Sequence, residues 1–190
     1  MTHGLDMIAE LTADHHEIEQ LFQRLEALPH GDPGRRALAD AVTLELVQHA
    51  VAEDEYLYPA IRACVPGGAA LADQAAAVHA EVERILRDLE GRPADEPRFD
   101  VLVAQAALLV RTHIEDEKAL VFPRLARSCD AEYLAGLGSR MKYAKTHASG
   151  PPHPHTGRPR ADRMLAPGPG LVDRARDMIA GRGRSTGGRP

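Results

Sequence analysis

A chain of 190 residues is long enough for one domain of ordinary size with an additional segment. Hydrophobic residues make up 44% of it, mostly Ala, Leu and Val, and aromatic residues only 4%, which favours closely packed helices. The net charge of −5 is unevenly divided, because residues 1–139 carry 12 basic and 25 acidic side chains whereas residues 140–190 carry 11 and 3. The chain lacks both an apolar run of the roughly 18 residues that a membrane span needs and a signal-peptide pattern, so we predict a cytoplasmic protein with no membrane partner.

Helical periodicity dominates the first three quarters of the chain. Apolar residues recur at the 3.6-residue period, and proline or glycine ends each periodic segment. Short connections between long helices make neighbours antiparallel, so we predict an all-α fold, an up-down-up-down four-helix bundle with a short fifth helix, over residues 1–146. The expected helices span about residues 5–28, 35–63, 69–90, 98–128 and 131–145.

One short motif recurs on each of the four bundle helices. A histidine and a glutamate four residues apart lie on one helix face, so both side chains can reach the same metal ion. A shift of 64 residues places residues 14–26 on residues 78–90 and carries the second histidine of the pattern onto the fourth, which indicates a duplicated helical hairpin. The pattern occurs at His15–Glu19, His49–Glu53, His79–Glu83 and His113–Glu117.

The ligand types predict a metal centre with two ions. Buried glutamates are costly unless cations neutralise them, and metal ions would supply that charge. Four histidines with three or four carboxylates exceed a tetrahedral zinc site and suit two adjacent ions bridged by carboxylates. Imidazole and carboxylate ligation without thiolate favours iron first and manganese second, with zinc as a substitute. The expected metal ligands are His15, His49, Glu53, His79, Glu83, His113 and Glu117.

Residues near these ligands have several interpretations. Glu19 has the right spacing for a ligand but could instead lie at the rim of the site. Tyr56 follows Glu53 by three residues and could be a ligand, a hydrogen-bond donor to bound peroxide, or a packing residue. Pro59 and Pro123 fall inside the second and fourth helices, where the missing backbone donor should bend each helix just beyond its ligand pair.

This pattern resembles the hemerythrin-like HHE cation-binding family over about residues 5–127. The resemblance implies a non-haem di-iron centre with an oxo or hydroxo bridge inside a four-helix bundle, and a site for O2 or a related small molecule. It also implies that the four histidines are terminal ligands and that Glu53 and Glu117 bridge the irons. The residues that carry the resemblance are His15, His49-x3-Glu53, His79-x3-Glu83, His113-x3-Glu117, Tyr58-Pro59 and Phe122-Pro123.

Two positions depart from the oxygen-carrying members of that family. They have a histidine where this chain has Glu83, and an aspartate five residues after the fourth-helix histidine, where this chain has Glu117 four residues after it. An added carboxylate should favour the ferric state, so we predict easy autoxidation and a centre that reacts with H2O2 in a catalase-like manner, or with NO or O2. The alternatives are a storage or sensor module for O2 or iron without turnover, and a helical interaction protein with structural metals.

The basic C-terminal segment, residues 147–190, is rich in Pro, Gly, Arg and His and should be mostly disordered, apart from a possible amphipathic stretch over residues 171–180. Its charge could attract an acidic partner, but it has almost no aromatic residues for base stacking, and no sequence-specific nucleic acid is expected. Cys64 and Cys129 are expected to be reduced thiols, with a disulfide left open.

Overall fold

The protein is all-helical in the part of the chain that its computed structural model describes, residues 6–148 and 172–173. The remaining positions of the basic segment, for which disorder was expected, lie outside the described residues. Each of the five expected helices is present, two of them continued through a π-helical turn. The elements are α1 (Met7–Ala27), α2 (Gly34–Ala52), the π-helix η1 (Glu53–Leu57), α3 (Tyr58–Cys64), α4 (Gly68–Leu89), α5 (Pro97–Asp116), the π-helix η2 (Glu117–Val121), α6 (Phe122–Ser128) and α7 (Ala131–Ala148).

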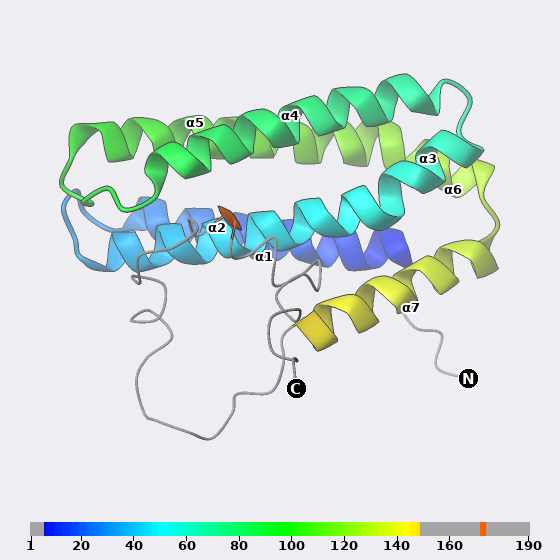
Figure 1. Ribbon diagram of the computed structural model, residues 1–190, viewed down its shortest axis with the longest axis horizontal. Helices are drawn as coiled ribbons and strands as arrows, with labels where there is room; N and C mark the ends of the chain where they lie inside the picture. Colours follow the sequence, from blue (N-terminus) through cyan, green and yellow to red (C-terminus); the bar gives the residue numbers. More distant parts are fainter. Residues whose placement is uncertain (1–5, 149–171, 174–190) are drawn as a thin grey trace, which may run out of the picture.

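Two antiparallel hairpins form the bundle, one from α1 and α2 and the other from α4 and α5 (Figure 1). Helices α3 and α6 extend α2 and α5 at one end of the bundle, and α7 lies against α1 on the outside. The predicted up-down-up-down four-helix bundle with a fifth helix is therefore confirmed. None of the described helices is long and apolar enough to cross a lipid bilayer.

Helix ends follow the local chemistry of the sequence. The Asp6 carboxylate caps α1 by accepting a hydrogen bond from the backbone N–H of Ala9 at 2.9 Å. Between α3 and α4 the chain turns at Gly67, which has φ +72°, a conformation that side chains with a Cβ rarely adopt. A Cβ on the next residue, Gly68, would lie 2.1 Å from the carbonyl oxygen of Ile61, so this turn needs both glycines.

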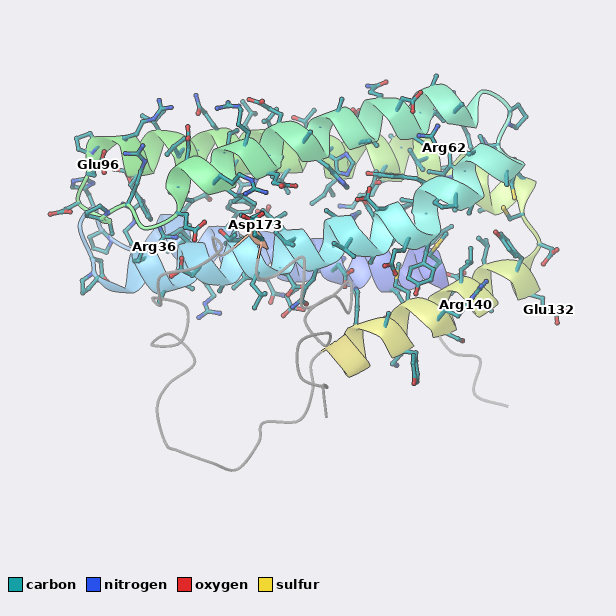
Figure 2. The ribbon with its side chains drawn as sticks, in the orientation of Figure 1. Arg36, Arg62, Glu96, Glu132, Arg140 and Asp173 are labelled. Carbon is teal, nitrogen blue, oxygen red and sulfur yellow. The ribbon has the colours of Figure 1, made fainter. Side chains whose placement is uncertain are left out.

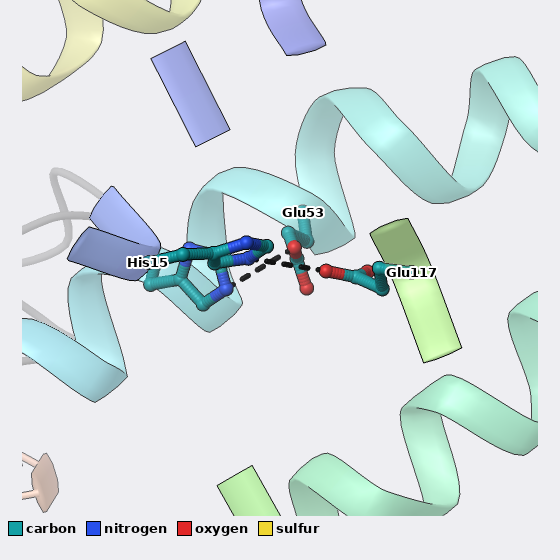
Figure 3. A group of neighbouring side chains, drawn as sticks. His15, Glu53 and Glu117 are labelled. Atoms are coloured by element: carbon teal, nitrogen blue, oxygen red, sulfur yellow. Dashed lines mark ion pairs between the residues drawn. The ribbon is translucent and has the colours of Figure 1, made fainter. Parts of the chain in front are cut away.

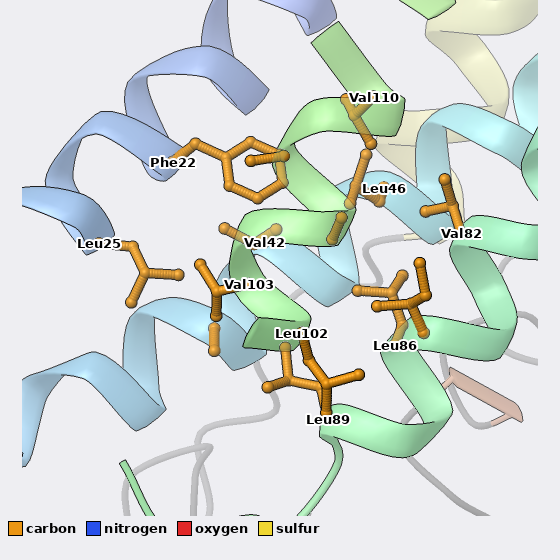
Figure 4. Close-up of a cluster of buried hydrophobic side chains, with 14 of the residues drawn as sticks. Phe22, Leu25, Val42, Leu46, Val82, Leu86, Leu89, Leu102, Val103 and Val110 are labelled. Atoms are coloured by element: carbon orange, nitrogen blue, oxygen red, sulfur yellow. The ribbon is translucent and has the colours of Figure 1, made fainter. Parts of the chain in front are cut away.

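The apolar core is divided into two clusters along the bundle. One cluster fills the end of the bundle that holds the α1–α2 loop, with side chains from all four long helices such as Phe22, Val42, Leu86 and Leu102 (Figure 4). The other joins the start of α1 to α3, α6 and α7. Along α1, Leu11 belongs to the second cluster and Ile18 to the first, and His15 lies between them. His15 of the repeated motif thus has an apolar cluster on each side of it along the bundle.

Both π-helices begin at a glutamate of the repeated motif. The backbone N–H of Tyr58 donates to the carbonyl of Glu53, five residues earlier, and Phe122 donates to Glu117 in the same way. A π turn contains one more residue than an α turn, so the side chains that follow are rotated by about 100° relative to a continuous α-helix. The direction of the ribbon changes between α2 and α3 (Figure 1), at the place where Pro59 predicted a bend.

Beyond the end of α7 at Ala148, the described residues of the basic segment are Val172 and Asp173. Val172 is fully buried against the first apolar cluster, and the Asp173 carboxylate lies 2.7 Å from the Arg87 guanidinium. This short piece of the segment is therefore packed on the bundle.

Candidate metal centre

Six side chains of the repeated motif converge inside the bundle. Five of them are buried, and the sixth, His79, is half-buried. Each long helix contributes one histidine, and each π-helix contributes its first residue, a glutamate. The converging side chains are His15 of α1, His49 of α2, Glu53 of η1, His79 of α4, His113 of α5 and Glu117 of η2.

Their donor atoms form two overlapping groups. The first contains His15, His49, Glu53 and Glu117, and the second contains Glu53, His79 and His113. Within each group the possible ligand atoms all lie within 4.8 Å of one another, close enough to surround a metal ion. Glu53 belongs to both groups.

The two carboxylate oxygens of Glu53 face different histidines. Its Oε1 lies 3.2 Å from His49 Nε2, whereas its Oε2 lies 3.1 Å from His79 Nε2 and 3.6 Å from His113 Nε2. A carboxylate in this position can give one oxygen to each of two neighbouring ions.

Glu117 is arranged in the same way from the other hairpin. Its Oε2 lies 3.2 Å from His15 Nε2, and its Oε1 lies 3.6 Å from His113 Nε2. Figure 3 shows the carboxylates of Glu53 and Glu117 facing each other beside His15. Each hairpin therefore sends one glutamate toward the histidines of both groups.

Several buried polar atoms of the cluster have no hydrogen-bond partner among the described residues. Such atoms are rare in folded proteins, because an unsatisfied buried polar group costs about 1–3 kcal/mol. Nitrogen and oxygen donors aimed at a common space are what a metal ion satisfies, so the residues present fit a metal site. The atoms are both ring nitrogens of His15 and of His49, Oε1 of Glu53, and both carboxylate oxygens of Glu117.

The pKa values of the two glutamates are shifted in opposite directions. Burial acts to raise the pKa of Glu53, but the charge of His49 and hydrogen bonds with His113 and His79 hold it well below its usual value. Burial and the negative charge of Glu53 raise the pKa of Glu117 well above its usual value. Burial, with the neighbouring His49, lowers the pKa of His15 to about 3. The raised pKa favours the protonated form of Glu117 and the lowered pKa favours the uncharged form of His15, so a metal ion would compete with a proton at Glu117.

Two further side chains support the ligands and were not identified from the sequence. The Tyr58 hydroxyl lies 3.2 Å from Glu53 Oε2 and 3.1 Å from His79 Nε2. Asp14 Oδ2 lies 3.5 Å from His49 Nδ1 and also contacts Lys145 of α7. The signal for Asp14 was its place directly before His15, on the neighbouring side of the helix. The signal for Tyr58 was the Tyr-Pro pair that follows the ligand motif.

Three expected or considered site residues lie elsewhere. Glu83 is in neither donor group, and its carboxylate lies 2.6 Å from Arg87. Glu19 is paired with Arg111 at 2.9 Å. Tyr56 packs against the second apolar cluster, as the packing interpretation proposed.

The direction of the helices explains the positions of both glutamates. Each lies four residues, about 6 Å, after a ligand histidine. On α2 and α5 that step leads toward the end of the bundle that holds α3 and α6, whereas on α1 and α4, which run the opposite way, it leads toward the other end. Four glutamates with the same sequence spacing therefore cannot meet in one antiparallel bundle, and the converging ligand set is the expected one without Glu83.

Known proteins resemble this chain in sequence and in fold. A relative described as a DNA nickase, from Nostoc sp. strain PCC 7120, is 26% identical over 136 residues, and the match covers 70% of this chain but only 37% of that longer protein. A crystal structure of a hemerythrin HHE cation-binding domain-containing protein from Mycobacterium kansasii has the same fold, with a TM-score of 0.69 at 22% identity over 90% of this chain and 99% of that one. The family described as Hemerythrin HHE cation binding domain matches residues 6–125. The chain therefore belongs to the hemerythrin HHE cation-binding domain family.

Proposed function

We propose that this protein holds two metal ions bridged by Glu53 and Glu117 and that the centre consumes hydrogen peroxide. The observation that carries the two-metal part of the proposal is the shared position of Glu53, whose two oxygens face His49 on one side and His79 with His113 on the other. One ion would be held by the first donor group, and the other by the second group together with Oε1 of Glu117.

Iron is the metal that we favour, with manganese or zinc as substitutes. Both donor groups consist of imidazole nitrogens and carboxylate oxygens, and two bridging carboxylates would stabilise a higher cation charge. A pair of iron ions would supply Lewis acidity and redox equivalents to a bound peroxide, such that two molecules of H2O2 give two of water and one of O2. NO and O2 are further small molecules of suitable size.

The protein's own contribution is to position and shield the metal ions. The apolar layers on both sides of the cluster exclude bulk water from the ligands. Burial and the charges of Glu53 and Glu117 raise the pKa of Tyr58, so its hydroxyl keeps its proton at neutral pH. That hydroxyl donates a hydrogen bond to Glu53 Oε2 and lies beside His79, so it helps to hold the shared carboxylate in position.

The test combines metal content, absorption and O2 evolution. The purified protein should contain two iron ions per chain, absorb in the near ultraviolet as an oxo-bridged ferric pair does, and evolve O2 from H2O2. Glu53→Gln should lose the metals and the activity together, whereas Glu55→Gln, an exposed glutamate of the same π-helix, should keep both. Reversible O2 uptake over many cycles without peroxide consumption would instead favour the storage or sensor function.

A further inference from the structure

Lys145, on the fifth helix α7, reaches the support of the metal ligands from outside the four-helix bundle. α7 packs along α1, and from Glu132 near its start it runs past Arg140 toward the middle of the bundle (Figure 2). Its inner face is anchored by Met141, which is fully buried in the second apolar cluster. One helical turn later, the half-buried side chain of Lys145 contacts the carboxylate of Asp14 on α1.

One oxygen of Asp14 faces two nitrogen donors. Its Oδ2 contacts the Lys145 ammonium, and the same oxygen lies 3.5 Å from Nδ1 of His49. That separation exceeds the usual range for an N–H···O hydrogen bond, about 2.7–3.2 Å. Nδ1 of His49 is accordingly a buried nitrogen without a hydrogen-bond partner among the described residues, while Nε2 of the same ring faces Glu53 in the cluster. Lys145 therefore holds the Asp14 carboxylate beside the ligand ring but short of a hydrogen bond with it.

The contact between Asp14 and His49 bears directly on metal binding. A carboxylate that accepts a hydrogen bond from one ring nitrogen of a histidine raises the basicity of the other nitrogen, the one that holds the metal. An oxygen that also accepts from an ammonium gives less of its charge to the imidazole. The positive charge of Lys145 close to the ligand also opposes the binding of a cation. Both effects of Lys145 lower the affinity of the centre for metal.

We propose that Lys145 is a positioning residue that restrains Asp14, so that docking of α7 and tight metal binding compete for one carboxylate oxygen. The proposal rests on the metal-binding part of the proposed function and does not depend on peroxide consumption. Coupling between two binding events is reciprocal. A metal ion on His49 therefore draws Asp14 away from Lys145 by the same factor by which Lys145 weakens metal binding. The outer helix thus responds to whether the centre holds metal.

Zinc affinity of the full chain measures one direction of this coupling. Lys145→Met should bind Zn²⁺ about three- to tenfold more tightly than the unaltered protein, because Asp14 can then close on His49. Lys145→Arg keeps the positive charge and should stay within about twofold of the unaltered protein. Lys142→Met is the matched control, because Lys142 is an exposed lysine of the same helix. It should leave the zinc affinity unchanged.

A second background separates the path through Asp14 from any other contact of Lys145. In Asp14→Asn protein, Lys145→Met should change the zinc affinity by no more than about twofold, since the shared carboxylate is gone. An affinity of Lys145→Met alone that is equal to or below that of the unaltered protein would overturn the inference, as would an equal gain in both backgrounds. Melting temperatures in the presence of chelator show whether each variant is folded.

The other direction of the coupling can be measured at the lysine itself. Metal-free and zinc-loaded full chains are treated with an amine-acetylating reagent, and peptide mass spectrometry gives the rate at each lysine. Lys145 should react about three- to tenfold faster with zinc bound, because Asp14 then holds its ammonium less firmly, whereas Lys142 should react equally in both states. An unchanged or slower reaction of Lys145 would overturn the response of α7 to metal.

The same titrations separate this inference from the function on which it rests. Zinc binding by the unaltered protein with an equal affinity in Lys145→Met overturns the inference and leaves the metal centre standing. Absence of zinc binding by the unaltered protein overturns the metal centre and the inference together.

Discussion

Replacing Asp14 with asparagine should weaken metal binding about tenfold. Asp14 is 8% exposed, and its carboxylate lies beside Nδ1 of His49, the nitrogen opposite the one that faces Glu53. A carboxylate in that position fixes the ring and raises the basicity of the ligand nitrogen, and its loss costs about 10–100-fold in metal affinity. The separation of 3.5 Å is longer than an ordinary hydrogen bond, so we expect the low end of that range, or ~1.4 kcal/mol.

The assay is a competition titration of Zn²⁺ or Fe²⁺ between the protein and a coloured chelator. Asp73→Asn is the control, because Asp73 is an exposed aspartate of α4 that pairs with Arg62 at 2.7 Å, away from the cluster. Thermal unfolding of both variants in the presence of chelator would detect a general loss of stability. The reasoning is refuted if Asp14→Asn binds within twofold of the unaltered protein, or if Asp73→Asn loses as much affinity.

Three further predictions concern groups near the centre or at the end of the bundle. Tyr58→Phe should lower metal affinity about 10-fold or more in the same titration, whereas Tyr56→Phe should not, because only the Tyr58 hydroxyl contacts a ligand carboxylate. In metal-free protein, the raised pKa of Glu117 means that this group ionises at lower pH in the unfolded chain than in the folded one. The contribution of Glu117 to the free energy of unfolding is therefore lost as pH rises above ~4.5, by about 1.4 kcal/mol per pH unit up to the folded-state pKa. Urea unfolding across this pH range should show a weaker fall in stability for Glu117→Gln than for the unaltered protein, and identical curves would contradict the assignment. Burial and the neighbouring Cys64 raise the pKa of the Cys129 thiol to about 12. Alkylation of Cys129 at pH 8 under reducing conditions should therefore be at least ~100-fold slower than alkylation of an ordinary thiol. A normal alkylation rate, measured by peptide mass spectrometry, would contradict this.

The helices and the histidines could be predicted because one periodicity determines both. A ligand histidine such as His49 or His113 lies in the apolar stripe of its own helix, and the stripe can be identified from the sequence without knowledge of the other helices. Four such stripes in a bundle all face the same interior. The family resemblance and the general position of the centre followed from this.

The missed residues depend on information that a single helical stripe does not contain. Glu83 has the same spacing from its histidine as Glu53, but it lies on a helix that runs the other way, and only the three-dimensional arrangement shows that the two glutamates point to opposite ends. Tyr56 has the right spacing for an α-helix, but the π turn places Tyr58 at the ligands instead. Pro59 indicated an irregular helical turn, but it did not show which of the following side chains that turn would direct toward the ligands.

Metal ions at the proposed centre would hold the two hairpins together, because each hairpin sends a carboxylate toward the histidines of the other. Glu53, from the first hairpin, faces His79 and His113 of the second, and Glu117 faces His15 of the first. Neither hairpin by itself contains a complete donor group, so under the two-metal proposal the hairpins would have to pack together before both ions could bind. Removing the metal with a chelator should accordingly weaken the packing between the two hairpins first, while the two helices within each hairpin stay packed on each other.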